Sequence, residues 1–225
     1  MNACDYLKFQ HPFTCIVSGT TSSGKTNLVR RILSNWKYVI NIRTSKLKVL
    51  WCFGQMQDLY KFAIDNVEIV YFEGVPTLSD IQNIQPNIIV MDDLMDEIKK
   101  DVVKLFTRGS HHLGISVFFI VQNLFNTNLR TMSLNSHYII LMKGLRTTQQ
   151  VEFLARQIFP GKSKNVLSAY KLATQKPYGY LLIDLHPKSL DQFRLRTRIL
   201  HDEVSDSLRN KHSCTPVYFD INLEE

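Results

Sequence analysis

Eight residues near the start of the chain have the types and the spacing that bind a phosphate chain. They are Gly19, Thr20, Thr21, Ser22, Ser23, Gly24, Lys25 and Thr26. They match the pattern GxxxxGK[ST], whose glycines let backbone N–H groups face phosphate oxygens at the positive N-terminus of the next helix. We expect Lys25 to reach the β- and γ-phosphates of ATP, and the Thr26 hydroxyl to bind Mg²⁺. The alternative is a chance Gly/Ser-rich turn.

Two adjacent carboxylates follow the apolar run NIIVM and form a second candidate site. They are Asp92 and Asp93. Two carboxylates at a buried strand end repel each other without a cation, so a metal site is favoured over a structural acid pair. We expect Asp92 to hold Mg²⁺, directly or through water, and Asp93 to polarise the attacking water. Asp96 and Glu97 instead fit the acidic first turn of the next helix.

A polar residue, Gln122, ends the apolar run GISVFFIVQN. In a parallel sheet the C-terminal ends of the strands line the ligand crevice. Gln122 is therefore expected beside the two acids, where its amide would contact the γ-phosphate or orient water. The alternative is an amide that caps the end of the strand.

Seven apolar runs are expected to be the buried strands that position these side chains. They occupy residues 12–18, 48–54, 67–74, 87–93, 114–123, 136–144 and 178–186. Apolar residues recur at helical spacing after Lys25 and over 56–64, 78–84 and 96–110. Strands that are apolar on both faces and alternate with amphipathic helices indicate an α/β fold. Its sheet would be mainly parallel, with helices on both faces.

No repeat, low-complexity segment or long linker divides the 225 residues, which suffice for one domain with a substantial core. We predict a single domain over residues 1–200 and a C-terminal tail or arm over 201–225. The segment PGKSKN (160–165) lacks the upstream glycine and the preceding apolar strand, so it is interpreted as a basic loop and not as a second phosphate loop.

Three arginines near the end of the predicted domain alternate with apolar residues. They are Arg194, Arg196 and Arg198. A period of two indicates a strand, and we expect it to lie near a sheet edge with the arginines on a solvated face. The alternative is that they track the phosphates of a nucleic acid.

The composition is that of a soluble globular protein, with 44% hydrophobic and 21% charged residues. The net charge of +7 favours contact with a polyanion. No apolar run approaches the roughly 20 residues that cross a bilayer, and the N-terminus lacks the organisation of a secretion signal. An intracellular protein without membrane contact is therefore expected. The cysteines are scattered without a CxxC pair, which favours reduced thiols.

The order of the three sites resembles the FtsK–HerA superfamily of DNA-pumping P-loop ATPases, whose fold is RecA/FtsK-like. Longer blocks look like the DNA-packaging ATPases of Polinton/Maverick elements, adintoviruses and related large DNA viruses. These blocks are DDLMDE, FTRGSHHLGISVFFIVQNLF, LRTMSLNSHYIILMKGLR, LARQIFPG and KPYGYLLIDLHP. The resemblance extends from about residue 10 to about residue 200 and leaves out both ends of the chain.

The resemblance implies an ATPase that forms a homo-oligomeric ring and threads double-stranded DNA into a preformed capsid. It implies ATP and Mg²⁺ as cofactors, and a capsid or portal vertex as a partner. The expected location is the infected host cell or the virion. Contacts to DNA would be made mainly to phosphates, and would be independent of sequence and weakened by salt.

Ring motors complete each site with an arginine from the neighbouring subunit. The candidates are Arg130 and Arg146, which flank predicted strands, followed by Arg108. Family members often carry Asp-Glu where this chain has two aspartates. Because Asp93 has a shorter side chain than glutamate, Gln122 or Asp96 is the alternative residue to hold the attacking water.

Two other classes of function fit a phosphate loop. One is a P-loop small-molecule kinase, which would need a lid of arginines and an acceptor pocket. The other is a non-catalytic protein that binds nucleotide as a structural part of an assembly. Turnover stimulated by DNA separates the translocase from the kinase, and any turnover that depends on Lys25 excludes the non-catalytic protein.

Overall fold

The computed structural model describes residues 7–55, 60, 62–94, 110–124, 130–144, 147–203, 217–219 and 221. The helix predicted over 96–110 lies outside this part of the chain apart from Ser110. Of the helix predicted over 56–64, residues 56–59 and 61 lie outside it, and residues 62–64 are not helical, so that part of the prediction is wrong. The two remaining predicted helices are present as α1 (Lys25–Ser34) and α3 (Leu78–Ile84).

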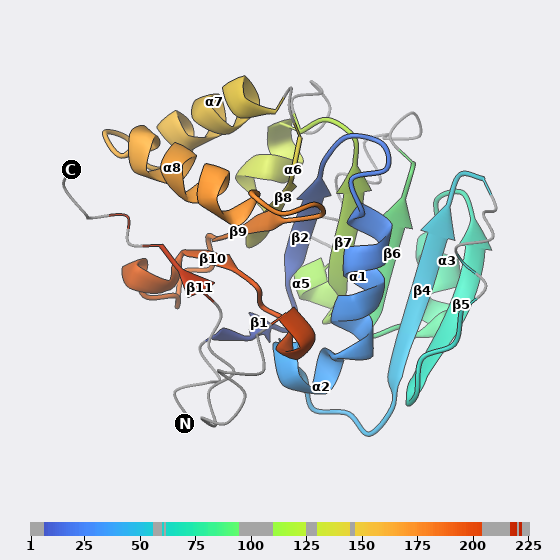
Figure 1. Cartoon of the computed structure of the whole chain (residues 1–225). Helices are drawn as coiled ribbons and strands as arrows, with labels where there is room; N and C mark the ends of the chain where they lie inside the picture. The colour runs from blue at the N-terminus through green and yellow to red at the C-terminus, as the bar shows by residue number, and fades with distance from the viewer. Residues whose placement is uncertain are drawn as a thin grey trace.

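Nine strands of the described chain form one sheet (Figure 1). Their order is β11 (Val217–Tyr218), β10 (Leu195–Thr197), β9 (Tyr180–Asp184), β8 (Tyr138–Met142), β2 (Thr14–Ser18), β7 (Ser116–Val121), β6 (Ile88–Asp92), β4 (Leu47–Phe53) and β5 (Val67–Glu73). All seven predicted strands are among them. The six strands from β8 to β5 run parallel to one another, and β9, β10 and β11 pair antiparallel. A separate parallel pair consists of β1 (Phe9–Gln10) and β3 (Ile40–Asn41).

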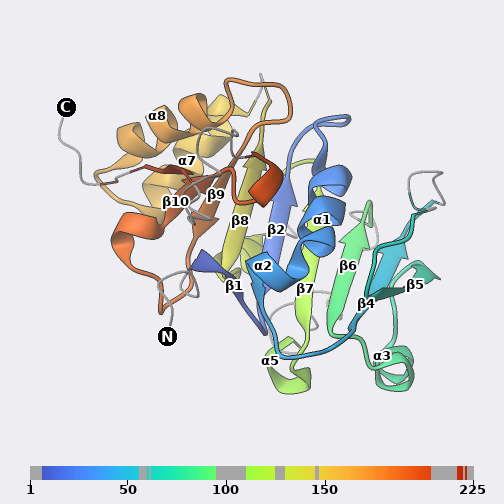
Figure 2. The same cartoon turned by 60° about the horizontal axis from the view of Figure 1, so that its bottom comes forward.

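Helices cover both faces of the sheet, which confirms the predicted α/β architecture (Figures 1 and 2). On one face, α1 and α2 (Trp36–Val39) pack apolar side chains against the central strands. On the other face, α3, α7 (Thr148–Ile158) and α8 (Ser163–Ala173) do the same. Two short helices are α5 (Ser110–Leu113) and α6 (Arg130–Leu134). None of the helices in the described ranges is long and apolar enough to cross a membrane.

The helices that cover the sheet bury the residues that helical spacing selects. In α1 these are Leu28, Val29, Ile32 and Leu33. Helices α7 and α8 are not among the predicted helices, although their buried residues follow the same spacing; these are Val151, Leu154, Ala155, Val166, Ala169 and Tyr170. The segment 160–165, interpreted as a basic loop, therefore runs into the first turn of α8, which begins at Ser163.

The arginine-rich segment differs from its prediction, because Arg196 does not lie on a solvated face. Its side chain is 1% exposed, and its Nη2 donates to Asp184 Oδ2 at 2.7 Å. The strand is only three residues long and lies between β9 and β11, one place inside the sheet edge. Alternation correctly predicted a strand, but an acid on the neighbouring strand β9 lets the arginine be buried.

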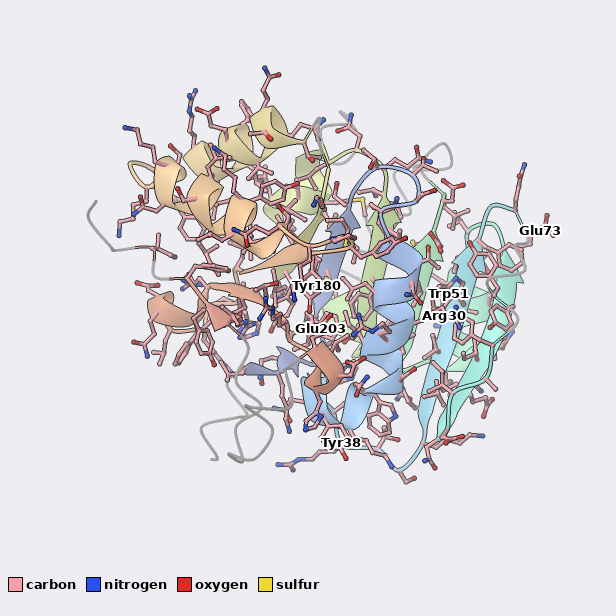
Figure 3. The ribbon with its side chains drawn as sticks, in the orientation of Figure 1. Arg30, Tyr38, Trp51, Glu73, Tyr180 and Glu203 are labelled. Carbon is pink, nitrogen blue, oxygen red and sulfur yellow. The ribbon has the colours of Figure 1, made fainter. Side chains whose placement is uncertain are left out.

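Residues just after position 200 contact the rest of the fold. His201–Glu203 form a short 3-10 turn. Arg31 of α1 pairs with Asp202 at 2.8 Å and with Glu203 at 3.0 Å. The hydroxyl of Tyr180 at the start of β9 donates to Glu203 at 2.7 Å, and Figure 3 shows these two side chains next to each other. The boundary at residue 200 stays a prediction.

Candidate nucleotide-binding site

The sheet order brings the three predicted sites to one edge. β7 lies between β2 and β6, and all three strands run parallel. The phosphate loop after β2, Gln122 after β7 and the acids at the end of β6 therefore meet at the same C-terminal edge. The backbone N–H of Gly19 donates to the carbonyl of Val121 at 3.2 Å, which fixes the start of the loop to the end of β7.

The backbone of the phosphate loop has the conformation that its glycines permit. Gly24 has φ 92° and Ser22 has φ 61°. A β-carbon at Gly19 would lie 2.6 Å from Met142 Cβ and 2.6 Å from Ser23 Oγ, so a larger residue does not fit there. The buried Ser23 hydroxyl has no hydrogen-bond partner within the described residues. A tightly wound loop with an unused polar atom at the start of a helix fits a phosphate ligand.

The Lys25 side chain folds back over this loop. Its Nζ donates to the carbonyls of Gly19 at 2.8 Å and Thr20 at 3.0 Å. Burial lowers the pKa of Lys25, and the negative charges of Asp92 and Asp93 oppose that shift. The ammonium group is therefore held between the loop and the acids, where a terminal phosphate would complete its set of acceptors.

Asp92 is the buried acid of the site, with 4% of the residue exposed. Its Oδ2 accepts from Thr26 Oγ1 at 2.9 Å and from the Tyr60 hydroxyl at 3.2 Å. Burial raises the pKa of Asp92, while these two hydrogen bonds and the charge of Lys25 oppose the rise. The Thr26 hydroxyl and the Asp92 carboxylate are hard oxygen donors of the kind that Mg²⁺ prefers, so this pair fits the predicted metal ligands.

Asp93 and Gln122 lie together on the exposed side of the acid pair. Gln122 Nε2 donates to Asp93 Oδ1 at 3.3 Å. Asp93 has φ 57°, a left-handed conformation that aspartate tolerates better than most residues. A β-carbon at Gly54 would lie 2.8 Å from the carbonyl oxygen of Asp93, so the turn after β4 packs closely against this position.

One cavity of about 310 Å³ joins these residues. Its walls are formed by Thr21, Ser22, Gly24, Lys25, Thr26, Asn27, Asp92, Asp93, Ile120 and Gln122. A cation, a hydroxyl, two carboxylates and an amide thus converge on one space next to a helix N-terminus. This set can bind a polyphosphate with its metal and orient water at one end.

The arginine candidates are not placed in this cavity. Arg108 and Arg146 lie outside the described residues, and so do Asp96 and Glu97. Arg130 is the first residue of α6, but its side chain is outside the described part of the chain. Their predicted roles stay predictions.

Sequence reasoning missed Tyr60. This residue is 0% exposed, and its ring lies near those of Trp51 and Phe53, with centroids 5.8 and 5.4 Å apart. Burial and the nearby charge of Asp92 raise the pKa of Tyr60, so its hydroxyl stays protonated and donates to that carboxylate. Its position in a segment of helical spacing gave no sign of this contact, because the contact depends on the end of β4 lying beside the end of β6.

No protein-family model and no curated protein matches the sequence. Solved structures are nevertheless similar. The genome packaging NTPase B204 from Sulfolobus turreted icosahedral virus 2 with ATP-gammaS has a TM-score of 0.56 at 10% identity, over 83% of this chain and 96% of that one. Its complex with AMPPCP has 0.53 at 11%, over 77% and 93%. B204, the DNA-packaging ATPase from Sulfolobus turreted icosahedral virus, has 0.53 at 12%, over 78% and 94%.

At these identities the similarity establishes the fold and not the activity. The chain has the fold of a P-loop NTPase, with a mostly parallel sheet between two layers of helices. The phosphate loop, the acid pair and Gln122 occupy the ligand-binding edge of that fold.

Proposed function

We propose that the chain is an ATPase that uses ATP hydrolysis to move double-stranded DNA into the capsid of a virus or virus-like transposon. The observation that carries this proposal is the grouping of Lys25, Thr26, Asp92, Asp93 and Gln122 around one cavity. The P-loop NTPase fold and the similar solved structures, which are named as packaging NTPases, support it. The net charge of +7 favours contact with DNA phosphates.

Each of these five residues has a role in this proposal. Lys25 offsets negative charge on the β- and γ-phosphates, and Thr26 and Asp92 supply oxygen ligands for Mg²⁺. The metal, when bound, neutralises charge that develops on the phosphate oxygens. Asp93 polarises a water that attacks the γ-phosphorus as the bond to the β-phosphate oxygen breaks. Gln122 holds that water or contacts the γ-phosphate.

The proposed coupling to DNA involves more than one subunit. We propose a homo-oligomeric ring in which an arginine from the neighbouring subunit completes the site, with Arg130, Arg146 and Arg108 as candidates. The ring would act at a capsid or portal vertex in the infected cell. DNA contacts would be made to phosphates, so they would not depend on sequence.

The experiment is a measurement of ATP hydrolysis with and without long double-stranded DNA of two unrelated sequences. We expect both DNAs to stimulate turnover, and the stimulation to fall as salt rises, because phosphate contacts release counterions. Lys25→Ala is expected to lower turnover by about 100-fold or more, the scale of removing a charge-stabilising group. Lys37→Ala, an exposed lysine of α2, is the matched control and should leave turnover unchanged.

Two results would contradict the proposal. Turnover that requires Lys25 but is indifferent to DNA would favour the small-molecule kinase. Nucleotide binding without any turnover, with and without DNA, would favour the non-catalytic assembly protein.

Tyr60→Phe tests the contact that sequence reasoning missed. The substitution removes only the hydroxyl that donates to Asp92 at 3.2 Å and keeps the buried ring. We expect the Mg²⁺ concentration for half-maximal ATP turnover to rise by about tenfold, because groups that orient a metal ligand affect metal affinity on that scale. Tyr71→Phe is the control, since its hydroxyl donates to the carbonyl of Phe62, at 3.4 Å, and not to an acid of the site. An unchanged Mg²⁺ requirement would show that Tyr60 does not position Asp92.

A further inference from the structure

A second cavity, of about 490 Å³, lies on the opposite side of the phosphate loop. Its walls are formed by Thr20, Thr21, Ser22, Ser23, Lys143, Gly144 and Tyr178. It shares Thr21 and Ser22 with the cavity that holds the acids, so the two spaces meet at the loop. Nothing in the role of the acid pair accounts for this second space.

The order of the strands gives a nucleotide its direction across the loop. Asp93 and Gln122 follow β6 and β7, which lie on one side of β2. Lys143 and Gly144 follow β8, which lies on the other side. A nucleotide whose terminal phosphate faces Asp93 and Gln122 must extend its nucleoside end away from them. That direction leads from the loop into the second cavity.

Tyr178 presents an aromatic ring in that space. The residue is 68% exposed, and its ring lies against the phosphate loop: a β-carbon at Gly24 would be 3.0 Å from Tyr178 Cδ1. Its φ of 58° is uncommon for a bulky residue. A β-turn holds this conformation, because the Gly179 N–H donates to the carbonyl of Lys176 at 3.1 Å. The turn thereby places an exposed aromatic ring beside the phosphate loop.

The turn that carries Tyr178, residues 174–179, is fixed to the end of β8. The Lys143 N–H donates to the carbonyl of Gly179 at 2.8 Å, and its Nζ donates to the carbonyl of Gln175 at 2.7 Å. A β-carbon at Gly179 would lie 2.6 Å from the carbonyl oxygen of Ala173, so the turn closes only with glycine. In both views this turn, between α8 and β9, lies beside the loop that joins β2 to α1 (Figures 1 and 2).

We propose that the second cavity is the nucleobase site of this chain, and that the base of a bound nucleoside triphosphate stacks on the ring of Tyr178. The inference rests on the proposed function, since it takes ATP as the ligand of the phosphate loop. An exposed aromatic face is the group on which bases stack, and its removal weakens binding by about 5- to 100-fold per stacked base.

The test separates the base from the phosphates. Binding of ATPγS and of inorganic tripolyphosphate, each with Mg²⁺, is measured by calorimetry on the full chain and on Tyr178→Ala, Tyr178→Phe and Tyr38→Ala. Tyr38 is the matched control, an equally exposed tyrosine (67%) of α2. We expect Tyr178→Ala to weaken ATPγS binding by about 5- to 100-fold and Tyr178→Phe to retain it. Tripolyphosphate binding should be the same in all four proteins.

Other outcomes are equally decisive. If Tyr178→Ala binds ATPγS as tightly as the unsubstituted chain, or if it weakens ATPγS and tripolyphosphate equally, the base does not stack on Tyr178. In both cases the proposed function stands. The proposed function fails if the unsubstituted chain binds neither ligand. It also fails if Lys25→Ala binds both ligands as tightly as the unsubstituted chain does. In either case the proposed nucleobase site fails with it.

Discussion

Asp92→Asn is expected to lower ATP turnover by about 100-fold or more while the protein stays folded and still binds nucleotide. Asparagine has nearly the shape of aspartate, and its carbonyl oxygen can accept the hydrogen bonds from Thr26 and Tyr60. It cannot supply the negative charge with which the carboxylate would attract Mg²⁺. The variant therefore separates the chemistry of the site from its structure.

Folding stability provides the internal check on that result. Burial raises the pKa of Asp92, which means that its ionised form is less stable in the folded protein than in water. A neutral amide avoids this cost, so Asp92→Asn should have a melting temperature at least equal to that of the unsubstituted chain. Asp191→Asn, on an exposed acid paired with Arg194, should leave turnover unchanged. Full activity of Asp92→Asn would remove this residue from the proposed metal site.

Arg196→Met is expected to lower the free energy of unfolding by about 3–5 kcal/mol, because it leaves the buried charge of Asp184 without its partner. The two side chains are each 1% exposed, and the Nη2–Oδ2 distance is 2.7 Å. Denaturant unfolding monitored by fluorescence measures the loss. Arg156→Met, which removes an exposed i,i+4 pair with Glu152, should change stability by about 0–1 kcal/mol.

A double substitution tests the reason for that loss. Nε and Nη1 of Arg196 have no hydrogen-bond partner within the described residues, so the buried pair does not satisfy all its polar atoms. Arg196→Met combined with Asp184→Leu removes both charges, and we expect it to recover most of the stability that the single substitution loses. If the double variant is less stable than Arg196→Met, the unpaired charge is not the cause.

Much of the fold follows from the sequence because buried parallel strands are apolar on both faces. Each of the seven predicted runs forms a strand, and α1 buries the residues that its spacing selects. The phosphate loop and the acid pair are equally local signals: their chemistry is contained in a few adjacent residues. Their meeting at one edge follows from the parallel sheet, but the place of β7 between β2 and β6 is not visible in the sequence.

The parts that sequence reasoning missed depend on contacts between distant residues. Tyr60 and Asp92 are 32 residues apart, and only the packing of the turn after β4 brings them together. Arg196 has the pattern of a solvated residue, and its burial depends on Asp184 of the neighbouring strand. The short strand β11 pairs two residues from a segment without clear periodicity. A pattern read along the chain cannot contain such information.

The contacts of residues 202 and 203 have a mechanical consequence. Glu203 contacts both Arg31 of α1 and Tyr180 of β9. α1 begins at the phosphate loop, and β9 begins two residues after Tyr178. Glu203 thus links α1, which starts at the phosphate loop, to β9, which follows the turn that carries Tyr178. A chain shortened at residue 200 would keep every residue of both cavities but lose these contacts with Glu203. The span between the phosphate loop and the aromatic turn would then be set by the sheet and its core packing alone.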